Sequence, residues 1–190
     1  MNIEQIAEHL LGRLRKELSP SLSYHSWQHT VDVRQAAIMY AELEGLSAED
    51  RMLVEIAAIY HDSGFMTATK EHETESCAIA RAELPGFGIT SDQVDKVCAI
   101  IMATRLPQIA TTPAEMVLAD ADLDYLGRTD YASISSLLVN EWKHNGMEID
   151  DQKWRSIQIE FLSKHTYFTK SARSLRDAQK AVNIEQIKNS

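Results

Sequence analysis

MLVEIAAIYHD, residues 52–62, is almost wholly apolar until it ends in an imidazole and a carboxylate. A helix that is apolar around most of its circumference is buried in the centre of a fold. Polar side chains at the end of such a helix lose contact with water, so they need partners of their own. The stretch therefore predicts a central helix that carries His61 and Asp62 to the rim of a hydrophobic core.

Helical periodicity continues from this stretch in both directions along the chain. Apolar residues recur three and four positions apart, and Ser47 and Thr90 stand where helix caps are expected. The expected helices cover roughly 3–18, 25–44, 47–63, 71–84, 90–102, 115–126, 131–143, 151–164 and 169–187. No convincing run alternates apolar and polar residues as a strand would. We therefore expect an all-α fold, a compact single domain over residues 1–190 with roughly eight or nine helices.

The composition suits a single globular domain and argues against some classes of function. The chain has 190 residues, of which 44% are hydrophobic and 25% charged, and this suits one globular domain. A formal net charge of -9 argues against a protein that binds a nucleic-acid duplex through its phosphates. No apolar stretch approaches the ~18 residues of a membrane span. Cys77 and Cys98 lack metal-ligand spacing and fall on apolar faces, which favours buried, reduced thiols and a cytoplasmic protein.

Two further segments carry groups that could share a site with His61 and Asp62. In YHSWQH, residues 24–29, two imidazoles lie four positions apart and would point the same way on a helix. In LADADLD, residues 118–124, three carboxylates lie among apolar residues and would repel one another unless a cation intervenes. Neutral imidazoles and carboxylates together form a mixed nitrogen and oxygen ligand set. Such a set suits Mn, Fe or Zn and leaves positions for water.

The order of these groups resembles the H…HD…D signature of the HD-superfamily phosphohydrolases, over segments that span residues 24–128. The resemblance implies that His29, His61, Asp62 and Asp122 are the ligands of a divalent metal ion. It implies Mn, Mg, Fe, Co or Zn as the ion, and it implies that Asp62 bridges to a second ion where two are bound.

The last ligand is ambiguous, because Asp120 and Asp122 both stand in the expected helix. Ala121-Asp122-Leu123 is similar to the Ala-Asp-Leu context of the last ligand in cyclic-nucleotide phosphodiesterases of this superfamily, and this favours Asp122. Asp120 is then expected beside the ligands or at another ion.

The same resemblance assigns His25 and Glu73 to catalysis. Tyr24-His25 is similar to the Tyr-His step of those phosphodiesterases, where the first His protonates the leaving oxygen, so His25 is the general-acid candidate. Many HD proteins have a carboxylate that orients water in the neighbourhood of Glu73. A divalent ion would lower the pKa of water from about 15.7 towards about 7 and would neutralise charge on the phosphoryl oxygens.

Two arginines are candidates for substrate binding. Arg105 continues the apolar stripe of the helix 90–102, where it could meet a phosphate or only stabilise the helix end. Arg128 could reach a phosphate or the carboxylates of Asp120 and Asp124.

The C-terminal helices in 129–190 are expected to complete the pocket. Gln158, three residues before Phe161, resembles the purine-holding Gln and the stacking Phe of cyclic-nucleotide phosphodiesterases. Both residues are therefore candidates for substrate binding.

Other polar side chains receive simpler interpretations. His72 is expected to be solvated on a charged first turn rather than to bind a second metal ion. Arg173, Arg176 and Lys180, in the mostly polar last helix, are expected on a solvated face.

These residues favour a metal-dependent phosphohydrolase that cleaves a phosphomonoester or phosphodiester bond in a small nucleotide-like substrate, with cyclic nucleotides among the candidates. One alternative is a di-iron oxygenase on the same scaffold. Another is a non-catalytic metal-containing domain that senses a nucleotide.

Overall fold

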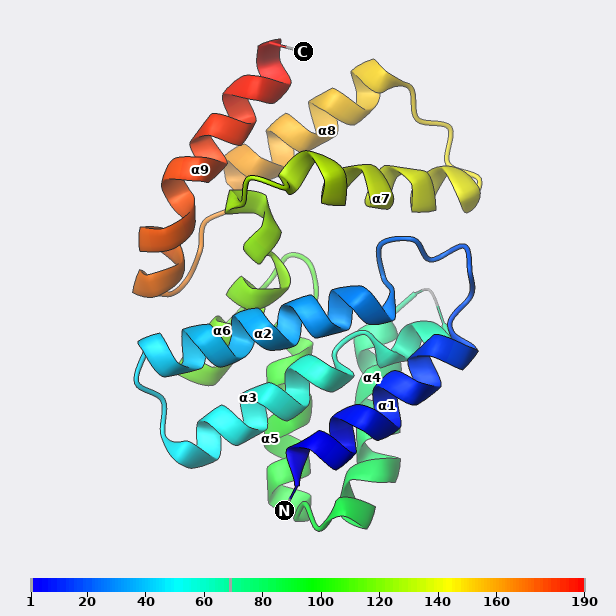
Figure 1. The fold of residues 1–190 in the computed structure, drawn as a ribbon, viewed down its shortest axis with the longest axis vertical. Helices are drawn as coiled ribbons and strands as arrows, with labels where there is room; N and C mark the ends of the chain where they lie inside the picture. The colour runs from blue at the N-terminus through cyan, green and yellow to red at the C-terminus, as the bar shows by residue number, and fades with distance from the viewer. Residues whose placement is uncertain (1, 69, 190) are drawn as a thin grey trace.

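The computed structural model describes residues 2–68 and 70–189, and all of its regular elements are helical (Figure 1). The expected all-α architecture is confirmed, because the described residues form nine α-helices and no strand. The α-helices are α1 Ile3–Glu17, α2 Trp27–Leu43, α3 Ala48–Tyr60, α4 His72–Glu83, α5 Ser91–Met102, α6 Pro113–Asp122, α7 Tyr131–His144, α8 Asp151–Lys164 and α9 Lys170–Asn189. Short 3-10 helices follow α3, α4 and α6: η1 Ser63–Met66, η2 Leu84–Phe87 and η3 Asp124–Gly127.

The helix α3 is the centre of the larger part of the molecule. It contacts α1, α2, α4, α5 and α6. Its last four residues before His61 are fully buried, as expected for the almost wholly apolar stretch that ends the helix. The side chain of Ser47 accepts the backbone N–H of Asp50 and so fixes the start of the helix. The start and end of α3 are thereby set, and the His-Asp pair lies at the edge of the core.

The C-terminal helices form a second, smaller core against η3. Its buried members are Tyr24, Leu123, Tyr125, Leu126, Tyr131 and Leu162. Figure 1 shows α7, α8 and α9 gathered at one end of the molecule, with α6 and η3 leading to them from the larger core. The molecule therefore has two packed regions, and the chain passes from one to the other just after Asp122.

Several expected helix boundaries are wrong, among them the end of the third helix, which is Tyr60 rather than residue 63, and two of the others have an identifiable cause. The second helix begins at Trp27 rather than at residue 25, because the carboxylate of Glu141 accepts the backbone N–H groups of Tyr24 and His25 before the helix starts. The sixth helix ends at Asp122 rather than at residue 126. The Tyr167 hydroxyl donates to the carbonyl oxygens of residues 123 and 124, where the chain has changed to a 3-10 turn.

The interpretation of the last helix as a solvated polar segment is also wrong in part. Lys180 is buried, and its ammonium group donates to the carbonyl oxygen of His165. Arg176 donates to the buried carboxylate of Asp124 from Nε at 2.6 Å. Gly127 lets α9 come this close, since a Cβ at Gly127 would lie 2.4 Å from the Cβ of Arg176. An ion pair between Arg176 and the buried carboxylate of Asp124 thus holds α9 against η3.

Asp120 fastens the C-terminal helices to the larger core. Its carboxylate is fully buried and accepts the backbone N–H groups of Phe168 and Thr169, each at 2.8 Å. The Thr169 hydroxyl donates to the same carboxylate at 2.7 Å. All three donors lie in the turn between α8 and α9, so the role of Asp120 is to hold that turn.

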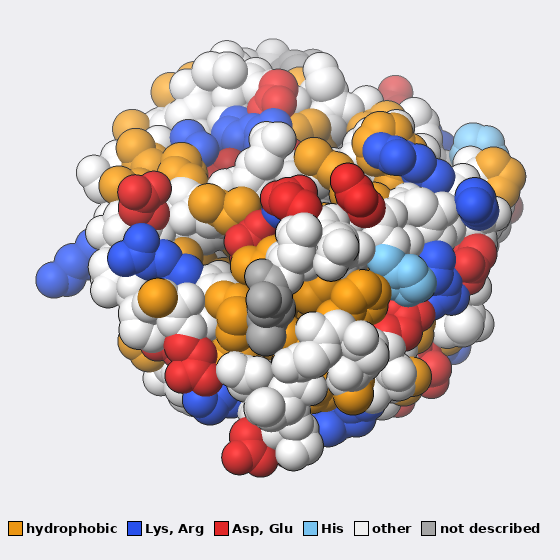
Figure 2. All heavy atoms as spheres, turned by 60° about the horizontal axis from the view of Figure 1, so that its bottom comes forward, with side chains coloured by type: hydrophobic (Ala, Val, Ile, Leu, Met, Phe, Trp, Pro, Cys, Tyr) orange, Lys and Arg blue, Asp and Glu red, His pale blue; other side chains and the backbone are white. Residues whose placement is uncertain are grey.

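Figure 2 presents one face of the molecule with its side chains coloured by type. Acidic and basic side chains are interspersed there, with hydrophobic side chains between them (Figure 2). None of the helices in the described part of the chain combines the length and the hydropathy that a membrane span requires.

Asp120→Ala is expected to lower the free energy of unfolding by about 3 kcal/mol, because it leaves buried donors at residues 168 and 169 without an acceptor. Urea unfolding followed by circular dichroism measures the change. Asp92→Ala, at an exposed residue in the first turn of α5, is the control and should cost less than about 1 kcal/mol. Unchanged stability together with loss of bound metal would instead make Asp120 a ligand.

Candidate active site

Four side chains from three helices converge at the end of α3. The Nε2 atom of His29, on α2, lies 3.4 Å from Nε2 of His61 and 3.2 Å from Oδ1 of Asp122, at the end of α6. Oδ2 of Asp62 lies 3.2 Å from Nε2 of His61 and 3.4 Å from Nε2 of His29. The structure thus brings together all four residues that the sequence predicts as metal ligands. Asp120 points away from this cluster, into the turn between α8 and α9.

The donor atoms of the cluster fit a divalent cation. Nδ1 of His61 lies 2.9 Å from the carbonyl oxygen of Ala58, so its proton is held there and Nε2 is free to act as a ligand. Oδ2 of Asp62 is buried and makes no hydrogen bond. A buried carboxylate oxygen without a donor is costly unless a cation compensates it. His29, His61 and Asp122 each offer a ligand atom, and these atoms lie within 4.8 Å of one another.

The charges of the cluster depend on one another. Burial alone would raise the pKa of Asp122, but hydrogen bonds from His29 and His61 lower it to about 2. Burial likewise opposes the charge on His61, yet the neighbouring carboxylates of Asp62 and Asp122 raise the pKa of its imidazole well above the ordinary value. Without a metal ion, the proton on His61 therefore supplies positive charge that the carboxylates require.

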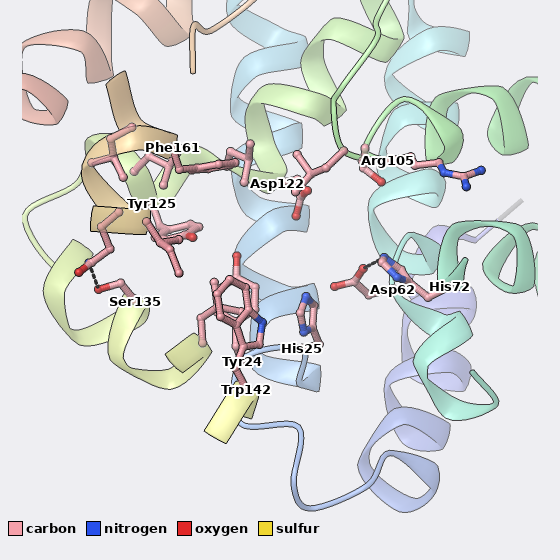
Figure 3. A pocket seen from close by; sticks show the side chains of 18 of the residues that line it. Tyr24, His25, Asp62, His72, Arg105, Asp122, Tyr125, Ser135, Trp142 and Phe161 are labelled. Atoms are coloured by element: carbon pink, nitrogen blue, oxygen red, sulfur yellow. Dashed lines mark hydrogen bonds and ion pairs between the residues drawn. The ribbon is translucent and has the colours of Figure 1, made fainter. Parts of the chain in front are cut away.

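His72 lies on the other side of Asp62, so the interpretation of it as a solvated residue is wrong. Its Nε2 atom is 3.4 Å from Oδ1 of Asp62 and 3.4 Å from Oε1 of Glu73 (Figure 3). Glu73 is buried. Asp62 therefore presents Oδ2 to His29 and His61 and Oδ1 to His72, which in turn lies beside Glu73.

Gly64 allows α4 to come close to the His-Asp pair. The hydroxyl of Ser76, on α4, accepts the N–H of Gly64 at 2.8 Å and donates to the carbonyl oxygen of His61 at 2.7 Å. A Cβ at Gly64 would lie 2.0 Å from the carbonyl oxygen of His72. A larger residue would therefore push the first turn of α4 out of the site.

His25 lies beside the cluster and is held by Glu141, which sequence reasoning missed. Oε1 of Glu141 lies 2.5 Å from Nδ1 of His25, while Oε2 accepts the backbone N–H groups of Tyr24 and His25 at 2.8 and 3.0 Å. Glu141 is buried on α7. Its position in the sequence contains a signal: it continues the helical stripe of Ile134 and Leu138, where a lone carboxylate requires a partner.

The ring of Phe65 packs against both His25 and His72. Its ring stacks on His25 with centroids 4.2 Å apart and on His72 with centroids 4.0 Å apart. Phe65 belongs to η1, directly after the His-Asp pair. The same short turn therefore helps to position groups from the loop before α2 and from the start of α4.

The cluster opens into a cavity of about 410 Å³ between the two cores. Asp62, His72 and Arg105 lie on one side of this pocket and Phe161 and Tyr125 on the other (Figure 3). The volume is that of a site for a small molecule.

The predicted substrate-binding residues divide into two groups. Gln158 and Phe161 line the pocket, as does Arg105, which pairs with Glu71 at 3.0 Å at the rim. Arg128 does not line it: its guanidinium donates to Asp32, on α2, and to the nearby Asp130. The structure therefore brings Arg105, Gln158 and Phe161 to the cluster and places Arg128 in an ion-pair network on another side of η3.

Solved structures share this arrangement of helices. Bacillus subtilis YpgQ in complex with ADP is similar with a TM-score of 0.68 at 21% identity, covering 96% of this chain and 94% of that chain. A predicted HD superfamily hydrolase from an uncultured Thermotogales bacterium is similar with a TM-score of 0.66 at 21% identity, covering 100% of this chain and 97% of that chain. A protein from Lactobacillus plantarum is similar with a TM-score of 0.71 at 18% identity, covering 100% of this chain and 98% of that chain. No curated protein matches the chain significantly.

The HD domain family profile matches residues 26–124, just over half of the chain. The match includes His29, His61, Asp62 and Asp122, the four residues that converge at the end of α3. The chain therefore belongs to the HD domain family.

Proposed function

We propose that the chain is a metal-dependent phosphohydrolase that cleaves a phosphomonoester or phosphodiester of a small nucleotide-like molecule. One observation carries the proposal: the unpartnered, buried Oδ2 of Asp62 lies among His29, His61 and Asp122 at the wall of a small-molecule pocket. Structural metal sites are closed, whereas a ligand set beside a pocket leaves room for water and substrate.

The four residues would hold a divalent ion, with Mn, Mg, Fe, Co and Zn as the candidates. When bound, such an ion supplies the positive charge that lowers the pKa of water and stabilises charge on phosphoryl oxygens. Asp62, His72 and Glu73 are the residues proposed to hold a second ion, since they meet on the far side of the Asp62 carboxylate. With one ion only, Glu73 is proposed to orient the attacking water.

His25 is proposed as the general acid. Burial would lower the pKa of His25, but its bond to Glu141 and the nearby carboxylates raise it above the ordinary value. Glu141 in turn keeps its charge, because the bond from His25 lowers a pKa that burial would raise. Glu141 occupies Nδ1, so Nε2 is the nitrogen that can donate a proton to the departing alkoxide oxygen. Glu141 acts through His25 and is a positioning residue.

A nucleotide-like substrate is supported by the rest of the pocket. Arg105 is proposed to contact phosphate at the rim, and Gln158 and Phe161 are proposed to contact the organic group. The similarity to YpgQ, whose structure contains ADP, supports the same class of ligand.

His61→Ala is expected to abolish metal retention and to reduce metal-dependent phosphate release on the order of a hundredfold or more. The measurements are metal content after dialysis and phosphate release from a panel of nucleotides, cyclic nucleotides and simple phosphate esters with added Mn, Mg, Fe or Co. His144→Ala removes an exposed imidazole on α7 and serves as the matched control. Full activity in His61→Ala would overturn the assignment, and metal binding without turnover by the unmodified protein would favour an oxygenase or a sensor.

Glu141→Gln is expected to change the pH profile of kcat. His25 donates a proton, so activity should fall as the pH rises through its pKa, which the charge of Glu141 holds above the ordinary value. Removing that charge should move the alkaline fall of activity to lower pH. The profile is measured by phosphate release at saturating substrate.

Glu160→Gln, at an exposed position on α8, is the control and should leave the profile in place. An unmoved alkaline limb in Glu141→Gln would rule out His25 as the acid that this limb reports.

A further inference from the structure

The pocket has two ends of opposite chemical character. The end at Asp62 carries the ionisable groups, and the other end is lined by side chains of α7 and α8. Leu138 and Trp142, on α7, face the cavity from one side, and Trp154, Ile157 and Phe161, on α8, face it from the other. The rings of Trp142 and Trp154 meet edge to face, with centroids 5.5 Å apart and planes at 83°. We name the space between these five residues the distal chamber.

No fixed positive charge reaches the distal chamber. Among the described residues that line the pocket, Arg105 is the only Lys or Arg, and it lies at the ionisable end (Figure 3). Its side chain is 49% exposed and pairs with Glu71. A carboxylate or a second phosphate placed between α7 and α8 would therefore lose its hydration without gaining a counter-charge, which is strongly unfavourable.

The polar atoms at the edge of the chamber are neutral and are already ordered. Nε2 of Gln158 donates to the hydroxyl oxygens of Tyr131 and Ser135, at 2.8 and 3.3 Å. Both amide protons are thereby used, and Oε1 is left as an acceptor. That atom fits an N–H or O–H group on an uncharged ligand and offers nothing to an anion.

We propose that the substrate carries its reacting phosphoryl group on an uncharged, largely apolar group, flat enough to lie between the indole pair and Phe161, and that a further anionic group on this part is selected against. The inference rests on the proposed function, which it deepens by naming the class of alcohol that is released. Aromatic and aliphatic walls of this kind stabilise an apolar group in proportion to the area that they remove from water.

Three esters with the same kind of leaving group test the preference: 2-phenylethyl phosphate, 2-carboxyethyl phosphate and ribose 5-phosphate. Each releases a primary alkoxide, so differences in kcat/KM report mainly the organic group. The metal-loaded protein should favour the phenylethyl ester by about tenfold or more over both others. Equal or higher kcat/KM for the carboxyethyl ester or ribose 5-phosphate would overturn the inference and leave the phosphohydrolase assignment standing.

Leu138→Asp places a carboxylate in the distal chamber and should remove most of the preference for 2-phenylethyl phosphate over ribose 5-phosphate, mainly by raising the KM of the phenylethyl ester. Leu137→Asp is the matched control, because Leu137 is the next residue on α7 and is 42% exposed. An unchanged preference in Leu138→Asp would count against the chamber as the binding place.

A binding measurement keeps the inference testable if no ester is hydrolysed, the outcome that would refute the proposed function itself. Two of the three tryptophans of the chain, Trp142 and Trp154, line the chamber, so their fluorescence reports its occupation. Titration of the metal-loaded protein with 2-phenylethyl phosphate should change the emission at concentrations at which 2-carboxyethyl phosphate has no effect. Identical responses to the two esters would show that the chamber does not select an uncharged group.

Discussion

Four ionisable side chains meet at the end of a helix whose last residues are apolar and fully buried, and this meeting constrains most of the molecule. His61, Asp62 and Asp122 are too close to one another and too far from water to keep their charges independently, and His29 lies against both carboxylates. Each needs a compensating group, either a proton on an imidazole or a divalent cation. The three helices that carry them must therefore keep their register, and the large core around α3 provides the rigidity for this.

The groups around the cluster are also held by hydrogen bonds and by close helix packing. The proton of Nδ1 on His61 is held by the carbonyl of Ala58, at the point where α3 ends and its carbonyl groups lack helical partners. Ser76 ties the turn after the His-Asp pair to α4. Because Gly64 has no side chain, that tie is short enough to bring His72 and Glu73 to Asp62. The second set of polar groups is thus a consequence of close helix packing.

Glu141 connects the two cores through the candidate general acid. Its carboxylate lies on α7, in the C-terminal region, and binds the loop that leads into α2 in the larger core. Neither His25 nor Glu141 lies within the residues matched by the family profile, and the walls of the distal chamber also lie beyond it. The family match therefore covers the proposed metal ligands, whereas the proposed acid and the walls of the distal chamber lie outside it.

The sequence by itself determined the helical architecture, and its resemblance to the H…HD…D signature singled out His29, His61, Asp62 and one of the two carboxylates at 120 and 122. Periodicity reports which face of a helix is buried, and clustered imidazoles and carboxylates among apolar residues require compensation wherever they meet. Only the tertiary structure decided between Asp120 and Asp122, since two positions along one helix turn these carboxylates to different neighbours. It also shows that Glu141 pairs with His25 and that Arg128 pairs with Asp32 outside the pocket. These contacts join residues far apart in the chain, and local patterns along a sequence carry no information about which distant partner a polar side chain will meet.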